Sequence, residues 1–234
     1  MILLCIRRRG AVFMRQLIYK DLFFFRVVWL VYVIVPFIFF GLNPDGEKLF
    51  PASCLLITAT SSTVLIAIDE RNKSGVMLNS LPVSRKEIVI ARYISSAIFV
   101  IGGMIATMLA VFLVRSIAGI GDIGIYHPSL YIEIPWYIVA RGLLFSVIFI
   151  VTLLPSYYGV GSKVVRGICT GITTGIGILI GMFMTDRWNQ GSSFSNWIMA
   201  PAHIGMIILG GIVLASIYIT SMFITIRMYE TRDI

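Results

Sequence analysis

The chain has 234 residues, of which 58% are hydrophobic and only 13% are charged, with a mean hydropathy of +0.94. Soluble domains have about 45–50% apolar and about 25% charged residues, so this composition excludes a soluble globular protein and predicts an integral membrane protein. The net charge of +8 does not indicate a nucleic-acid partner, because the Lys and Arg residues lie between apolar runs rather than along one soluble face. Membrane lipid is the partner that the composition predicts.

An amphipathic helix is expected at the start of the regular part of the chain. Residues 1–13 carry a positive cluster after an apolar stub, the reverse of a secretory signal, and we interpret them as an N-terminal extension or an upstream start. Apolar residues then recur at helical spacing: Met14, Leu17, Ile18, Leu22 and Phe25. This spacing predicts a helix over residues 14–26 that lies in the membrane interface and leads into the first span.

The predicted fold is all-α, a polytopic membrane protein with one domain over residues 14–234. A hydrocarbon core about 30 Å thick needs about 20 apolar residues per spanning helix, so the chain has room for about six spans. We place these spans at about residues 27–42, 50–68, 94–114, 138–154, 168–184 and 198–226.

The distribution of cationic residues predicts the orientation. Most Lys and Arg residues lie at the two ends of the chain and in alternate loops, and few are left for the other side. By the positive-inside rule, both termini and the loop between the second and third spans face the cytoplasm, which requires an even number of spans. The predicted location is therefore the cell membrane, with both termini cytoplasmic.

The loop between the second and third spans contains a cationic stretch that a proline interrupts. Ser84 and Glu87 have the S-x-x-E spacing of a capping box, which predicts a helix that begins near Arg85 and continues into the third span. Between Asp69 and Leu81 there is room for one short helix after Gly75, with four apolar contacts: Val76, Met77, Leu78 and Leu81. A short helix of this kind suits docking into a groove of a partner protein. The alternative is a solvated loop whose charges only set the topology.

Four segments now give the chain a resemblance to a known family. They are MRQLIYKDLFFFR (14–26), IDERNKSG (68–75), SLPVSRKEIVIARY (80–93) and MYETRDI (228–234). With this outline of apolar runs, the chain resembles the membrane subunits of type-2 ATP-binding cassette (ABC) exporters, in particular the small bacterial six-span permeases. The resemblance covers nearly all of the chain from Met14 onward.

The resemblance implies an elbow helix before the first span, a coupling helix between the second and third spans, and a dimeric pore. The dimer would contain a second copy of the permease or a paralogue. Separate cytoplasmic ATPase subunits, which bind ATP and Mg²⁺, would drive it. Carried onto this chain, the coupling segment is about residues 71–80, and the residues expected to couple to the ATPase are Arg71, Val76, Met77, Leu78, Leu81 and Arg85.

The chain itself is expected to hold no catalytic, cofactor or metal site. The phosphate-binding pattern GxxxxGK[ST] does not occur in the sequence, so the energy source would be in a partner. His127 and His203 are lone histidines, and the three cysteines lack a CxxC spacing.

Polar and small residues within the spans have two readings each. Thr58, Ser61 and Ser62 make the second span locally polar, which is tolerated where hydroxyls face other helices or a translocation path. The spacing by four of Gly171 with Gly175 and of Gly177 with Gly181 favours close helix packing, within one subunit rather than between subunits.

Three charged groups near the ends of the spans also carry expectations. Asp69 and Glu70 are expected to pair with Arg85 or Arg92 across the loop, as structural ion pairs. Arg141 is expected to snorkel outward from the fourth span.

Two other classes of function remain open on the sequence. A stand-alone channel or immunity-type membrane protein would need no ATPase. A membrane-embedded lipid enzyme would need clustered acidic or histidine residues at one depth, which the sequence does not supply convincingly. Amphipathic peptides, lipids and hydrophobic drugs fit an exporter of this composition about equally well.

Overall fold

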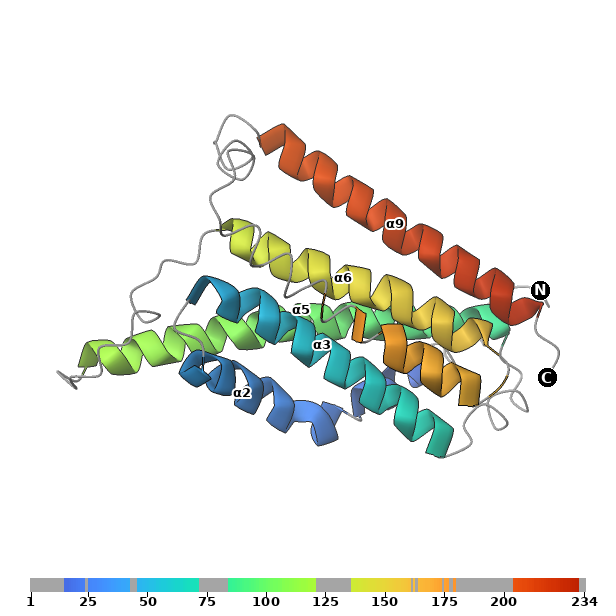
Figure 1. Cartoon of the computed structure of the whole chain (residues 1–234), viewed down its shortest axis with the longest axis horizontal. Coiled ribbons are helices and arrows are strands. Elements are labelled where there is room, and N and C mark those ends of the chain that lie inside the picture. The colour runs from blue at the N-terminus through green and yellow to red at the C-terminus, as the bar shows by residue number, and fades with distance from the viewer. Residues whose placement is uncertain are drawn as a thin grey trace, which may run out of the picture.

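The computed structural model of the chain (Figure 1) describes residues 15–23, 25–42, 46–71, 84–120, 136–160, 162, 164–173, 175–176, 179 and 204–231. Five long helices occur in this part: α2 (Phe25–Leu42), α3 (Gly46–Arg71), α5 (Arg85–Ile120), α6 (Trp136–Gly159) and α9 (Ile204–Glu230). Shorter helices cover residues 15–23 and Val164–Thr173. All regular structure in the described ranges is helical, as the composition predicts.

In the part of the chain that the structure describes, four helices are long and apolar enough to cross a membrane: Phe50–Arg71, Arg85–Leu113, Ile138–Gly159 and Ile208–Glu230. They coincide with the predicted second, third, fourth and sixth spans. Helix α2 coincides with the predicted first span and has 18 residues. Residues 168–173 of the predicted fifth span belong to the shorter helix Val164–Thr173. Beyond them, only residues 175–176 and 179 of this span are described.

Helix α5 packs against the four other long helices, while α3 packs against α2, α5 and α6, and α9 packs against α6 and α5. Small residues let α3 approach its neighbours closely. A Cβ atom on Gly103 of α5 would lie 3.2 Å from Ile57, and one on Gly142 of α6 would lie 3.3 Å from the ring of Phe50. The side chains of Ser53 and Thr107 also join α3 to α5, with their hydroxyl oxygens 2.9 Å apart.

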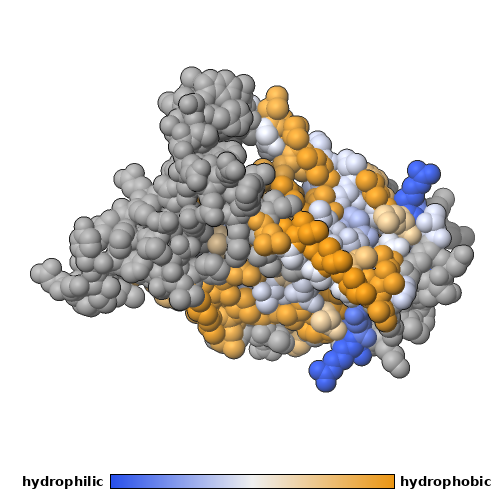
Figure 2. Space-filling model, in the orientation of Figure 1, coloured by the Kyte–Doolittle hydropathy of each residue, from blue (hydrophilic) through white to orange (hydrophobic). Residues whose placement is uncertain are grey.

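The largest core cluster connects α3, α5, α6 and α9. Its most deeply buried members include Val89, Phe149, Ile150, Leu153 and Leu154. Many other apolar side chains face outward, as the orange surface of Figure 2 shows, while strongly hydrophilic side chains lie toward one end. An exposed apolar surface of this kind is what helices need in order to contact hydrocarbon.

Helix α6 extends farther than the sequence predicts. The expected span ends at Leu154, before Pro155, but the helix continues through this proline to Gly159. Proline has no N–H group and therefore leaves the carbonyl four residues earlier without its helical donor. In this chain, Ser221 Oγ of α9 donates a hydrogen bond of 3.1 Å to that carbonyl, on Val151. A contact between helices thus compensates for the proline.

Candidate functional site

At one end of the bundle, α3, α6 and α9 finish and α5 begins (right side of Figure 1). We call this the charged end, because eight charged residues of the described chain form ion pairs there: Lys20, Asp21, Asp69, Glu70, Lys86, Arg92, Arg166 and Glu230. Both flanks of the predicted coupling segment emerge here, at the end of α3 and the start of α5. Of the segment itself, about residues 71–80, only Arg71 lies within the described residues.

The start of α5 is fixed by its cap. The backbone N–H of Ser84 donates to Glu87 Oε2 at 3.0 Å, and the N–H of Glu87 donates to Ser84 Oγ at 3.3 Å. These are the two hydrogen bonds of a capping box, as the S-x-x-E spacing predicts. Helix α5 is continuous over 36 residues, so a single helix connects the flank of the coupling segment to the predicted third span.

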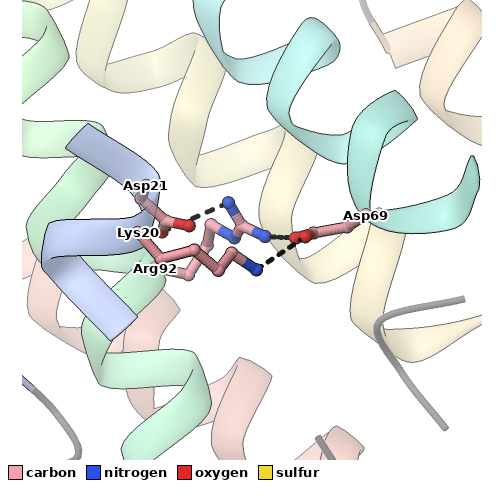
Figure 3. A network of polar contacts seen from close by, with 4 residues as sticks. All are labelled: Lys20, Asp21, Asp69 and Arg92. Carbon is pink, nitrogen blue, oxygen red and sulfur yellow. Dashed lines mark hydrogen bonds and ion pairs between the residues drawn. The ribbon is translucent and has the colours of Figure 1, made fainter. Parts of the chain in front are cut away.

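Four side chains from three helices form the Arg92 cluster (Figure 3), which consists of Lys20, Asp21, Asp69 and Arg92. Arg92 Nη1 lies 3.3 Å from Asp21 Oδ2, and Arg92 Nη2 forms an ion pair with Asp69 Oδ2. Lys20 Nζ donates to the other oxygen of Asp69 at 2.9 Å. The cluster therefore ties the helix over residues 15–23 to α3 and α5.

The charges of the Arg92 cluster balance. Two cations face two carboxylates, and the side chains of Arg92 and Asp69 are only 8% and 7% exposed. An isolated buried ion costs several kcal/mol in lost hydration, so such groups persist only when they are paired and hydrogen-bonded. The planar guanidinium suits this position because its donors can reach two carboxylates at once.

Lys20 is the most accessible member of the Arg92 cluster. Its side chain is 35% exposed. Burial lowers the pKa of its ammonium below the usual 10.5; the nearby Asp21 carboxylate opposes this effect and the Arg92 charge adds to it.

A second ion pair at the charged end joins α3 to the helix Val164–Thr173. Arg166 Nη1 lies 3.3 Å from Glu70 Oε1, and the Arg166 guanidinium stacks 5.1 Å from the ring centroid of Tyr157 in α6. This pair holds the last turn of α3 against two further helices.

Arg85 connects the start of α5 to the end of α9. Its Nη1 donates to the carbonyl oxygens of Tyr229 and Glu230 at 3.2 Å and 3.3 Å. Its guanidinium also lies 5.7 Å from the ring centroid of Tyr229. The last carbonyls of a helix lack intrahelical donors and carry the negative end of the helix dipole, so a cation is favoured there.

The predicted ion pairs at the charged end are correct in part. Asp69 pairs with Arg92 as expected, but Glu70 pairs with Arg166 instead of Arg85 or Arg92. Sequence reasoning missed Asp21. A signal was present, because Asp21 follows Leu17 by four residues and Ile18 by three, which places it on the apolar face of its helix.

The residues expected to contact the ATPase are placed only in part. Arg71 is exposed at the end of α3, and Arg85 binds the backbone of α9. Val76, Met77, Leu78 and Leu81 lie outside the described residues.

The hydroxyl residues proposed for a translocation path are buried inside the protomer. Thr58, Ser61 and Ser62 are 0%, 2% and 4% exposed. Ser61 Oγ donates to the Ile57 carbonyl at 2.7 Å and lies 3.1 Å from the Tyr32 hydroxyl of α2. Within the described chain, Thr58 Oγ1 and Ser62 Oγ have no hydrogen-bond partner. This arrangement places the three residues against neighbouring helices.

Two further expectations concern α6 and the predicted fifth span. Arg141, expected to snorkel outward, is buried next to Gly142, on the part of α6 that approaches α3. Gly171 and Gly175 are exposed, and a Cβ atom on either would meet nothing within 4 Å, so the described chain does not pack against them. Gly177 and Gly181 lie outside the described residues.

Long apolar helices in one bundle, with paired charges gathered at one end, define a membrane-embedded helical protein. Comparison with known families identifies it further. The sequence model described as "ABC-2 family transporter protein" matches residues 16–230. The chain therefore belongs to the ABC-2 family of transporter membrane proteins, as a permease subunit. Searches of curated proteins and of solved structures gave no match.

Proposed function

We propose that this chain is the permease subunit of an ABC exporter that is driven by separate cytoplasmic ATPase subunits. The match to the ABC-2 family over residues 16–230 is the observation that carries the proposal. Two permease subunits, as a homodimer or with a paralogue, would form the translocation path. ATP and Mg²⁺ would bind to the partner ATPases, and the cargo would be an amphipathic peptide, a lipid or a hydrophobic drug.

The segment between Arg71 and Ser84 is the proposed contact with the ATPase. Its flanks are held on both sides, by the Arg92 cluster and Glu70 at the end of α3 and by the capping box at the start of α5. A displacement of the segment would therefore also displace α3 and α5, because both helices are held where the segment joins them. Apolar anchors between such flanks suit a groove on a partner protein.

The mechanism follows from linkage. ATP binding to the partner subunits can shift the permease between two states only if the ATPase binds these two states with different affinities. The coupling segment must therefore contact the ATPase differently in each state. In the predicted orientation this segment and both termini face the cytoplasm, where the ATPase subunits are.

Replacing Met77 and Leu78 together by Glu tests the proposed contact. Because the change puts charges where apolar anchors are expected, partner-stimulated ATP hydrolysis should fall about tenfold or more, which corresponds to the loss of an interfacial anchor. The measurement is the ATPase rate of the copurified complex in lipid nanodiscs.

The matched control replaces Asn79 and Ser80 by Glu, which adds the same two charges without removing an apolar side chain. It should keep most of the stimulation. Unchanged stimulation in the Met77 and Leu78 variant would refute this contact. Purification of an active chain with no ATPase would instead favour a stand-alone channel.

A further inference from the structure

Within the described chain, α9 packs against the bundle mainly at the charged end. Near its start, Ile208, Leu209 and Ile212 are 60%, 63% and 61% exposed, while near its end Thr225 and Tyr229 are 0% and 7% exposed. In Figure 1, α9 lies closest to α6 at the charged end and diverges from it toward the other end. Movement of the attached end would therefore reposition the whole helix.

Two layers of contacts join this end of α9 to α5. In the first layer, Arg85 donates to the carbonyls of Tyr229 and Glu230, and Lys86 Nζ lies 3.5 Å from Glu230 Oε1. In the second, the hydroxyl of Tyr93 lies 2.9 Å from Ser221 Oγ and 2.8 Å from Thr225 Oγ1. The Tyr218 hydroxyl also donates to the carbonyl of Tyr93 at 2.7 Å.

Arg85 occupies the first position of α5, directly after the capping residue Ser84. The capping box fixes its backbone, and its side chain reaches the last turn of a helix that is 144 residues away in sequence. The bonds to α9 go to backbone carbonyls, which would otherwise lack helical donors. A shift of the flank of the coupling segment is thus passed directly to the end of α9.

From these contacts we infer that Arg85 is a positioning residue, which makes α9 move together with the flank of the coupling segment. This inference rests on the proposed function, because the displacement originates at the ATPase. It assigns to Arg85 a role inside the permease, in place of direct contact with the ATPase.

The test is hydrogen exchange of the full chain with its ATPase in nanodiscs, with and without ATP plus vanadate. In the wild type, nucleotide should change the exchange of residues 84–93 and of residues 218–230 together. In Arg85→Gln the response at 84–93 should persist, while that at residues 227–230, the last turn of α9 that Arg85 contacts, is lost. In the absence of nucleotide, the last turn of α9 in Arg85→Gln should also exchange about tenfold faster than in the wild type. The loss of a hydrogen bond to a charged group is large enough to cause this change.

Two further variants sharpen the test. Lys86→Gln removes the neighbouring positive charge, whose pair with Glu230 is exposed, and should respond like the wild type. Arg85→Lys keeps a cation that can bond one terminal carbonyl, so its response at 227–230 should be reduced but present. If Arg85→Gln does not accumulate in the membrane, the reduced response of Arg85→Lys serves as the test. A full response in Arg85→Lys then overturns the inference.

Other outcomes separate the inference from the proposed function. A response at 84–93 without one at 218–230 in the wild type overturns the inference alone. So does weaker binding of the ATPase to Arg85→Gln, since the guanidinium would then contact the partner. If the wild type shows no response at 84–93 and retains no ATPase, the proposed function fails and the inference fails with it.

Discussion

At the residue scale, the guanidinium of Arg92 lies between carboxylates from two helices, and each of these carboxylates is nearly inaccessible to water. Arg92→Met would keep the volume but leave Asp21 and Asp69 with one cation, Lys20. Removing one partner of a buried ion pair leaves an uncompensated charge, so we expect the free energy of unfolding to fall by about 3–5 kcal/mol. Denaturant unfolding in detergent micelles measures this change.

The control at this scale is Glu70→Gln, which removes a charge from a more exposed pair with Arg166. Glu70 is 39% exposed, so water can hydrate and screen its charge, and the loss of unfolding free energy should be smaller than in Arg92→Met. Equal losses of unfolding free energy in the two variants would mean that the Arg92 cluster contributes no more to stability than the pair of Glu70 with Arg166.

The Arg92 cluster also shows what the sequence can reveal about single residues. The pair of Asp69 with Arg92 could be predicted, because both flank one loop and therefore meet when the spans are antiparallel. The contact of Asp21 with Arg92 could not be predicted from spacing, since it depends on where the helix over residues 15–23 lies against the bundle. A buried charge needs a partner, but the sequence does not say which one.

At the element scale, the path of α6 through Pro155 depends on a side chain from α9. Ser221→Ala removes the donor to the Val151 carbonyl and one contact of the Tyr93 hydroxyl. Because a buried acceptor without a partner is costly, the free energy of unfolding should fall by about 1–3 kcal/mol. The matched control is Ser216→Ala, since Ser216 is exposed and its hydroxyl donates to the Ile212 carbonyl of its own helix. If both serine variants were equally stable, the donor from α9 would not be what sustains α6.

The start of α5 and the end of α6 differ in how well the sequence predicts them. The start of α5 follows from a local motif, so Ser84 and Glu87 are sufficient to place it. The end of α6 depends on a contact between helices, and local rules stop it at Pro155. Helix boundaries can be predicted where the groups that satisfy the backbone are adjacent in sequence.

At the scale of the whole molecule, composition predicts a bundle of apolar helices but not which helices touch. Gly103 and Gly142 lie against α3, although no spacing distinguished them, whereas Gly171 and Gly175 have the favoured spacing and contact nothing in the described chain. Apolar faces look alike in a sequence whether lipid or another helix covers them. The resemblance to ABC exporters supplied the class of transporter that composition alone did not.

The proposed function requires that the segment after α3 docks onto a separate ATPase in the cytoplasm. Site-specific photo-crosslinking from position 77 in intact membranes is the most direct test. The control is a probe at position 126, between the predicted third and fourth spans, which the predicted orientation places outside the cell. We expect a crosslink from position 77 to a nucleotide-binding subunit with a Walker A motif, and none from position 126. Labelling of position 77 by a membrane-impermeant reagent from outside the cell, or the absence of any crosslink to such a subunit, would contradict it.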